Sequence, residues 1–373
     1  MKYDISGGAF RKSGRFTEKD GVLYFAYSAN YIEFETEAGE VTLTFVTDND
    51  FSEVEHPSRA AVTVNNGRRW SEKEEAFEAA LLSDILLEEP GETAKTVFLG
   101  APGETKTVRV SKLSEAHYAL FGLRFIEARG DYEIRPTKAP EKFIEFVGDS
   151  LTCGYGNEGR EDSGEPFSTA TENPLDAFAV LAAEKLGTDY RLVSWSGIGT
   201  LSCYTPPEES RPHRGILMQD LYPYNAPLNE ARLSGTYKSG AGLITDDKTP
   251  YGFTEKPAAV VVTLGTNDES YTRSIKEREE DFAFVFGHFI DEIHKLNPGV
   301  PLLFCHGLCE DTLVPVFQRL TENYQLRHPE CPIRFFRMPQ QQKEGRGIDG
   351  HPNKKVHLQT AKCLAAELEK IIF

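Results

Sequence analysis

The sequence predicts two domains of different class, an all-β domain over residues 1–137 followed by an α/β domain over residues 138–373. At 373 residues the chain is longer than one typical domain. Its first part has short strand-like segments separated by glycine, proline and acidic clusters, which is typical of a β-sandwich or jelly roll. Its second part alternates apolar strands with amphipathic helices, which favours a parallel sheet covered on both faces, a three-layer α/β/α architecture.

Strands of the first domain are expected where apolar and polar residues alternate or β-rich runs occur. They lie at residues 31–35, 41–45, 61–64, 95–99 and 107–110. The third run continues into Asn65-Asn66-Gly67, a hairpin-type signal that predicts a turn. Lys138-Ala139-Pro140 then marks the junction of the two domains.

The second domain begins with an apolar strand at residues 143–147. Further strands are expected at 191–195, 258–264, 301–305 and 332–337, and helices at 174–187, 276–296, 313–327 and 354–371. Asn173-Pro174 gives the first helix an N-cap and a proline at its first position, and Gly187 ends it. The stretch from Tyr204 to Lys256 is long and rich in proline, glycine and tyrosine, and we expect it to wall the functional site.

Charge and composition exclude several classes of partner. The 41 basic and 58 acidic residues give a net charge of -17, whereas nucleic acids and anionic membrane surfaces are bound by basic patches. The same balance disfavours a polyanionic substrate and suits a neutral one. No segment approaches the ~20 apolar residues of a membrane span.

The N-terminal residues and the cysteines indicate in which cellular compartment the protein is expected. Residues 1–8 contain no apolar run that would serve as a signal peptide. We therefore expect a cytoplasmic protein, with secretion as the alternative if a leader has been removed. The six cysteines show no CxxC pair and no regular framework, which favours reduced thiols.

Four short words fall where strands of the second domain should end. They are Gly148-Asp149-Ser150-Leu151, Gly197-Ile198-Gly199, Gly265-Thr266-Asn267-Asp268 and Asp349-Gly350-His351-Pro352. Each word alone is an ordinary turn signal. Because ligands bind beyond the carboxyl ends of parallel strands, the set predicts one shared pocket that holds the groups for acyl transfer through a serine.

Each word contributes one chemical role. Ser150 is the candidate nucleophile, and His351 is the candidate base because an imidazole titrates near neutral pH. Asp349 is expected to orient His351 or to stabilise its imidazolium. The candidate oxyanion donors are Gly199, Asn267 and the main-chain N–H of Ser150.

The second domain resembles the SGNH (GDSL) hydrolase superfamily, whose blocks supply a catalytic Ser, an oxyanion Gly, an oxyanion Asn and a catalytic His. These roles carry over to Ser150, Gly199, Asn267 and His351, and the resemblance covers residues 140–373. It implies a flavodoxin-like α/β/α fold. The leading β region and the Asp-Gly-His-Pro-Asn form of the last word are similar to carbohydrate esterase family 2. That likeness implies an acetyl xylan esterase with an N-terminal jelly roll packed on the hydrolase domain.

The last word departs from the superfamily pattern. The superfamily usually places an aspartate three residues before the histidine, and that position is Ile348 in this chain. Asp349 lies two residues before His351 instead. Within the family some members work with a Ser-His dyad whose histidine is held by a main-chain carbonyl, so both a dyad and a triad stay open.

The resemblance implies a serine esterase that removes O-acetyl groups from xylan or xylo-oligosaccharides through an acetyl-enzyme on Ser150. Aromatic residues beside polar groups suit stacking on sugar rings. The predicted rim offers Tyr204, Tyr222, Tyr224, Tyr251 and Trp195. The alternatives are an acyltransferase or general short-chain esterase on another small acyl ester, and a non-catalytic carbohydrate-binding protein. The β domain has three candidate roles: glycan binding, shaping the cleft, or homo-oligomer formation.

No metal or cofactor is expected. No His, Cys and Asp cluster has convincing ligand spacing, and His357 is expected to be structural. Residues 154–159 spell GxGxxG but run into a polar loop rather than an apolar helix, which argues against dinucleotide binding.

Overall fold

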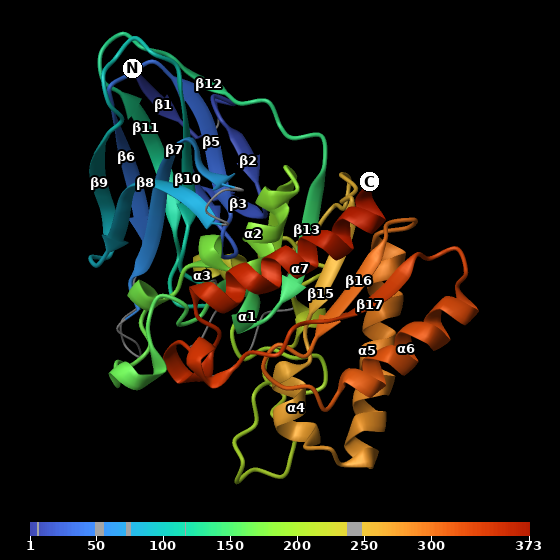
Figure 1. Ribbon diagram of the computed structural model, residues 1–373. Helices are drawn as coiled ribbons and strands as arrows, with labels where there is room; N and C mark the ends of the chain where they lie inside the picture. The colour runs from blue at the N-terminus through green and yellow to red at the C-terminus, as the bar shows by residue number, and fades with distance from the viewer. Residues whose placement is uncertain (6, 49–55, 72–75, 116, 237–247) are drawn as a thin grey trace.

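The computed structural model describes residues 1–5, 7–48, 56–71, 76–115, 117–236 and 248–373. Figure 1 shows antiparallel sheets in the N-terminal part of the chain and, beside them, a sheet flanked by helices in the C-terminal part. The six cysteines are all unpaired, as the sequence predicts. Within the described residues, no helix has both the length and the apolar character needed to cross a membrane.

Two antiparallel sheets make up the N-terminal part. One has the order β3-β4-β11-β6-β9 with β1 paired to β11, and the other has the order β12-β5-β10-β7-β8 with β2 paired to β5. The strands are β1 (Lys2–Asp4), β2 (Arg11–Ser13), β3 (Phe16–Lys19), β4 (Val22–Phe25), β5 (Tyr31–Thr36), β6 (Glu40–Thr47), β7 (Ser58–Ser71), β8 (Ala76–Leu87), β9 (Gly91–Phe98), β10 (Lys106–Lys112), β11 (Gly122–Ala128) and β12 (Ile134–Pro136). Apolar side chains of both sheets, including Phe45 and Val110, share one core.

One local expectation in this part is wrong. The chain does not turn at Asn65-Asn66-Gly67, because β7 continues through these residues and pairs with β8 as far as Ser71. The pairing register shifts between Thr63 and Arg68. The Asn-Asn-Gly signal therefore marks an irregularity within the strand pair. The other strands expected from the sequence are confirmed.

The C-terminal part is built on a five-stranded parallel sheet of order β14-β13-β15-β16-β17. Its strands are β13 (Phe143–Gly148), β14 (Asp189–Ser194), β15 (Ala259–Thr263), β16 (Leu302–His306) and β17 (Ile333–Arg337). Counted along the chain, the order is 2-1-3-4-5, which is that of flavodoxin-like folds. The predicted three-layer architecture is confirmed.

Helices cover both faces of this sheet (Figure 1). One face is covered by α5 (Lys276–Leu296) and α6 (Val314–Arg327), and the other by α2 (Phe178–Lys185) and α7 (Lys354–Ile372). The remaining helices are α1 (Ser150–Cys153), α3 (Pro227–Ser234) and α4 (Thr266–Thr272). Alternate residues of β15 point to opposite faces: Val262 packs in the core of α5 and α6, and Val261 in that of α2 and α7. The helix expected at 174–187 is split into a 3₁₀ turn, capped by the Asn173 side chain, and α2.

A buried arginine joins the antiparallel sheets to the parallel one. Arg15 is 1% exposed, and its guanidinium lies 3.1 Å from the Glu145 carboxylate of β13. It also donates to the main-chain carbonyls of Tyr222 and Tyr224 at 2.6 and 2.5 Å. Glu145 in turn accepts a hydrogen bond of 2.8 Å from the Tyr222 hydroxyl.

We expect Arg15→Met to destabilise the protein by about 3–5 kcal/mol, because it leaves the Glu145 carboxylate buried without its cation. Thermal unfolding followed by circular dichroism measures this. Adding Glu145→Gln should restore part of the loss. Lys12→Met is the matched control, since Lys12 pairs with Glu18 in solvent, where such pairs contribute ~0–1 kcal/mol. Equal unfolding temperatures for Arg15→Met and Lys12→Met would contradict the assignment.

Candidate active site

The candidate site lies where the order of the parallel strands reverses. Ser150 follows β13 directly, and Asn267 follows β15, the neighbouring strand. From β13 the chain proceeds to β14 on one side and later to β15 on the other. Open α/β sheets bind their ligands at such a switch point, outside the carboxyl ends of the strands. His351 arrives there on the loop between β17 and α7.

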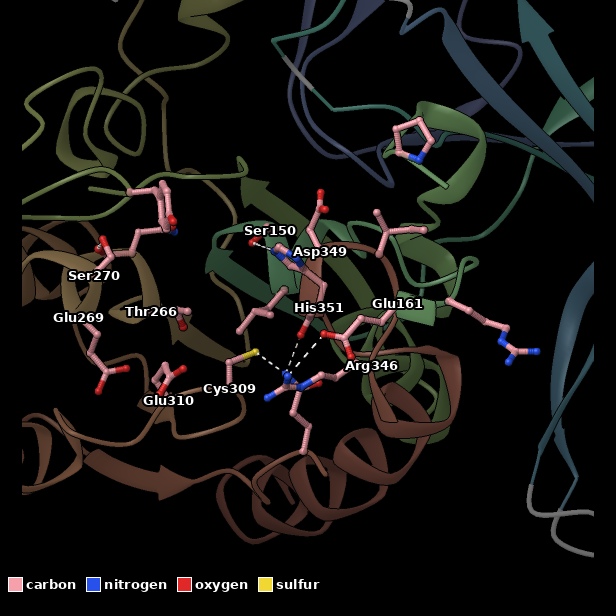
Figure 2. A pocket seen from close by; sticks show the side chains of 18 of the residues that line it. Ser150, Glu161, Thr266, Glu269, Ser270, Cys309, Glu310, Arg346, Asp349 and His351 are labelled. Carbon is pink, nitrogen blue, oxygen red and sulfur yellow. Dashed lines mark hydrogen bonds and ion pairs between the residues drawn. The ribbon is translucent and has the colours of Figure 1, made fainter. Parts of the chain in front are cut away.

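Ser150 and His351 are in hydrogen-bond contact. The Ser150 hydroxyl lies 2.9 Å from Nε2 of His351 (Figure 2). The Asp149 carboxylate caps α1 by accepting the N–H of Leu151 at 3.0 Å. Ser150 is the first residue of α1, where a main-chain N–H has no partner within the helix. Its hydroxyl and its N–H are therefore both available for chemistry.

The turn after α1 holds the loop that carries His351. Ile348 donates its N–H to the Gly156 carbonyl at 3.1 Å. A Cβ on Gly156 would lie 2.7 Å from the Ile348 side chain, and one on Gly159 would lie 2.5 Å from it. The glycines of the GxGxxG word therefore allow the close approach of Ile348, and the word does not lead into a helix of the dinucleotide-binding type.

The surroundings of His351 favour its neutral form. Burial lowers the pKa of His351, whereas the charge of Asp349 and the main-chain carbonyls of Asp349 and Ile348 oppose that shift. Nδ1 of His351 is buried and has no well-aligned hydrogen-bond partner among the described residues. The ring of Tyr155 lies 4.3 Å from the imidazole and stacks on Phe167 at 3.7 Å. A neutral imidazole is the form that can accept the serine proton.

The structure does not place the Asp349 carboxylate on Nδ1 of His351. Asp349 Oδ2 accepts a hydrogen bond of 2.8 Å from the Tyr155 hydroxyl instead. Asp349 has a φ of 52°, in the left-handed region. The charge of Asp349 still favours the imidazolium form of His351, which is the second of the two roles expected for it.

The amide of Asn267 lies beside the predicted glycine word. Nδ2 of Asn267 donates to the Ile198 carbonyl at 2.8 Å and lies 3.5 Å from the Asp149 carboxylate. Ser150 and Asn267 line the same cavity, whereas Gly199 is not among its lining residues. Gly199 follows Ile198 and so sits next to the Asn267 amide. A Cβ on Gly199 would lie 2.0 Å from the Ser202 carbonyl.

Asp268 fixes the loop after β14, a role that the sequence analysis did not assign. Its fully buried carboxylate accepts the N–H groups of Thr200, Leu201 and Ser202 at distances of 2.7 to 3.2 Å. Burial raises the pKa of Asp268 to about 6, although the three N–H groups oppose that shift. The sequence offers one signal for this role, because Asp268 directly follows Asn267 in the Gly265-Thr266-Asn267-Asp268 word.

Two other supporting residues were also missed. Glu115 comes from the N-terminal part, is fully buried, and accepts the Ser196 N–H at 2.6 Å and the Ser196 hydroxyl. It therefore fixes the start of the same loop from the other domain, and no local pattern could have revealed this. Tyr155, which contacts both Asp349 and His351, lies inside the GxGxxG word, a pattern that by itself suggests only dinucleotide binding.

The cavity over Ser150 has a volume of about 860 Å³ and a mixed polar lining. Its walls come from the 160–166 segment, α4, the 309–312 segment and the 341–351 segment. Figure 2 shows carboxylates such as Glu161 and Glu310 around the Ser150–His351 pair. Among the described residues, Tyr204 is the single aromatic residue of the lining, and it is 54% exposed.

The expected aromatic rim is therefore wrong apart from Tyr204. Tyr222 is fully buried against Glu145, and the Tyr251 ring packs 4.0 Å from the Arg15 guanidinium. Trp195 stacks on His117, and Tyr224 pairs with Pro250 in an isolated bridge. The stretch after Tyr204 joins the two parts of the molecule more than it walls the site. Residues 237–247 of this stretch lie outside the described residues.

His357 has a structural place, as expected from the sequence. It is fully buried in α7, and its Nδ1 accepts the N–H of Phe178 at 3.2 Å. Within the described ranges, the cavity lining contains no group of three metal-type ligands, since the single such cluster consists of His294, His328 and Glu330. The chemistry that the Ser150–His351 pair supports is acyl transfer through the serine hydroxyl.

The fold is a flavodoxin-like α/β/α unit preceded by two antiparallel sheets, with Ser150 and His351 at the switch point of the parallel sheet. No protein-family model matches the chain. The chain is similar to the cellulase/esterase CelE of Acetivibrio thermocellus, with 28% identity over 288 residues that cover 71% of this chain and 31% of CelE. It is also similar to an acetylxylan esterase / glucomannan deacetylase of Cellvibrio japonicus, with 29% identity over 226 residues that cover 57% of this chain and 55% of that protein.

A solved structure has the same fold over nearly the whole chain. It is a family two carbohydrate esterase from Clostridium thermocellum in complex with cellohexaose, with a TM-score of 0.78, 22% identity, and coverage of 97% of this chain and 98% of that one. The comparisons confirm the resemblance to carbohydrate esterase family 2. The matches span less than two thirds of the length of each of the two curated relatives.

We expect Asp349→Asn to lower kcat only a few-fold, whereas the loss of an orienting aspartate in a working triad costs about 10⁴-fold. Because burial lowers the pKa of His351, the acid limb of kcat/KM should lie below the ordinary histidine value of about 6.5. Removing the Asp349 charge, which raises that pKa, should move the limb to lower pH.

Hydrolysis of 4-nitrophenyl acetate across pH measures both quantities. Glu165→Gln is the control, because Glu165 also lines the cavity but makes no described contact with His351 or Tyr155. A loss of several thousand-fold in Asp349→Asn, or an acid limb that moves upward, contradicts the dyad.

Proposed function

We propose that this protein is a serine esterase that removes O-acetyl groups from carbohydrate, with xylan or xylo-oligosaccharides as the substrate class, through an acetyl-enzyme on Ser150. The observation that carries the proposal is the 2.9 Å contact between Oγ of Ser150 and Nε2 of His351 at the base of an open, polar cavity. A serine hydroxyl becomes an effective nucleophile when an adjacent base accepts its proton.

The geometry supports the following sequence of steps. Ser150 Oγ attacks the acetyl carbonyl while Nε2 of His351 takes its proton. The Ser150 N–H and the Asn267 amide stabilise the oxyanion, and the Gly199 N–H is the third donor that we propose. The C–O bond to the sugar then breaks, and His351 protonates the departing sugar oxygen. Water, deprotonated by His351, attacks the acetyl-enzyme, the bond between the acyl carbon and Ser150 Oγ breaks, and His351 returns the proton to Ser150 Oγ as acetate leaves.

The cavity suits an acetylated sugar better than a long acyl chain. Most of its lining residues are polar or charged, Arg160 and Arg346 among them, and the part that the structure describes has no broad apolar wall for a fatty chain. The exposed ring of Tyr204 offers one stacking surface for a sugar. The names of the curated relatives, an esterase/cellulase and an acetylxylan and glucomannan deacetylase, point to the same substrate class.

We also propose a division at residues 137/138, with a jelly roll as the N-terminal domain. In support, consecutive strands from β8 to β12 alternate between the two antiparallel sheets. The contact of Glu115 with Ser196 gives this domain a positioning role at the cleft.

Ser150→Ala should abolish acetate release, because the variant has no nucleophile to form the acetyl-enzyme. Acetate release is measured on acetylated xylan and acetylated glucomannan, and fatty-acid release on a long-chain ester. Ser234→Ala, a change at an exposed serine of α3 outside the cavity lining, should leave the rates unchanged. Release from the polysaccharides should exceed hydrolysis of the long-chain ester. Full activity in Ser150→Ala contradicts the proposal. Faster acetyl transfer to an added sugar than to water indicates an acyltransferase, and binding of xylan without any release indicates a carbohydrate-binding protein.

Asn267→Ala should lower kcat by about 10²–10³-fold, the usual cost of losing one oxyanion donor. Because the amide acts on the transition state, KM should change little. Steady-state kinetics and thermal unfolding together measure the effect. A variant that unfolds well below the wild type, or that loses affinity and keeps kcat, contradicts the oxyanion role.

A further inference from the structure

A group of metal-type side chains lies at the edge of the parallel sheet opposite Ser150. His294 is in the last turn of α5, His328 is the C-cap of α6, and Glu330 follows before β17. α5 and α6 end shortly before the amino ends of β16 and β17, whereas Ser150 follows the carboxyl end of β13. The group is therefore separate from the hydrolytic site.

The three side chains converge to within ligand distance. One nitrogen or oxygen atom from each of His294, His328 and Glu330 lies within 4.8 Å of the other two. Nδ1 of His328 is 3.4 Å from the Glu330 carboxylate. Two ligands of a tetrahedral zinc ion, each ~2.0–2.1 Å from the metal, have a similar separation of about 3.4 Å. The ring planes of His294 and His328 make an angle of 84°, and the ring centroids lie 5.8 Å apart.

A buried tyrosine orients both imidazoles. Tyr324 is 1% exposed, its hydroxyl lies 3.0 Å from Nδ1 of His294, and its ring stacks on His328 at 4.4 Å. The Asp291 carboxylate also lies near the Tyr324 phenol. In the tautomer of His294 whose Nδ1–H is donated to the Tyr324 oxygen, Nε2 keeps its lone pair for a metal ion. Metal-bound histidines ordinarily have such a partner on the second ring nitrogen.

The electrostatic surroundings favour a cation. His294 and His328 both sit at the C-terminal ends of long helices, where the unpaired main-chain carbonyls carry partial negative charge. Glu330 and Asp291 add two carboxylates close by. The chain as a whole carries a net charge of -17.

We propose that His294, His328 and Glu330 bind one divalent transition-metal ion of the zinc class, with water in the remaining position. Two imidazoles and one carboxylate are a common ligand set for such ions. The ion clamps the last turn of α5 to the segment between α6 and β17. Because the group lies at the far edge of the sheet, the ion stabilises the fold and takes no part in ester hydrolysis.

Titration of tag-free, chelator-treated protein with zinc chloride in an isothermal calorimeter tests the proposal. One zinc ion should bind per chain, and zinc should raise the unfolding temperature because it binds the folded state. His294→Ala and His328→Ala should lose both effects. Tyr324→Phe should weaken binding about 10–100-fold, the usual effect of losing the partner of a metal-bound histidine.

His288→Ala is the matched control, since His288 is an exposed histidine of the same helix outside the group. It should bind zinc as the wild type does, and hydrolysis of 4-nitrophenyl acetate should be equal with and without zinc in all these proteins. Absence of binding by the wild type, equal binding by His294→Ala, or equal weakening by His288→Ala overturns the proposal. These outcomes leave the esterase proposal unaffected, because they concern neither Ser150 nor His351.

Discussion

Ser150 and His351 stand 201 residues apart in the chain, and their hydrogen bond depends on two separate constraints. The parallel sheet delivers Ser150 at the carboxyl end of β13. The turn after α1 then binds Ile348 through the Gly156 carbonyl and packs closely on its side chain. This contact holds the loop before α7 over the serine. A side chain at Gly156 or Gly159 would displace Ile348 and with it the imidazole. Ser150 and the turn that positions the His351 loop therefore both lie in residues 150–159.

Buried carboxylates organise the rest of the site. Asp149 caps α1, Asp268 holds three N–H groups of the loop after β14, and Glu115 holds the start of that loop from the β domain. In a buried environment a hydrogen bond to a carboxylate is strong, and an unpaired carboxylate is costly. The loop beside Asn267 is thus fixed from both parts of the molecule, so the N-terminal part contributes to the geometry of the site.

Most of the fold could be predicted from the sequence because its signals are local. The spacing of apolar residues in α5 and the apolar run of β15 depend only on neighbours along the chain, and the structure has both where expected. Contacts between distant segments could not be predicted. The two-residue spacing of Asp349 and His351 left a dyad and a triad open, and it could not reveal that the Tyr155 hydroxyl donates to the Asp349 carboxylate. Tyr222 was expected at the rim because it lies in a tyrosine-rich stretch, but it is buried and donates to Glu145. Glu145 is paired there with Arg15, a contact between distant segments that the sequence does not reveal.

The central claim is that His351 activates Ser150 as a nucleophile. Covalent labelling with a fluorophosphonate, followed by mass spectrometry of the digested protein, tests it without any assumption about the sugar. The account predicts one adduct, on the peptide that contains Ser150, and labelling of His351→Ala that is slower by about 10²–10⁴-fold, the usual contribution of a general base. Labelling at another residue, or an equal rate in the two proteins, would contradict it.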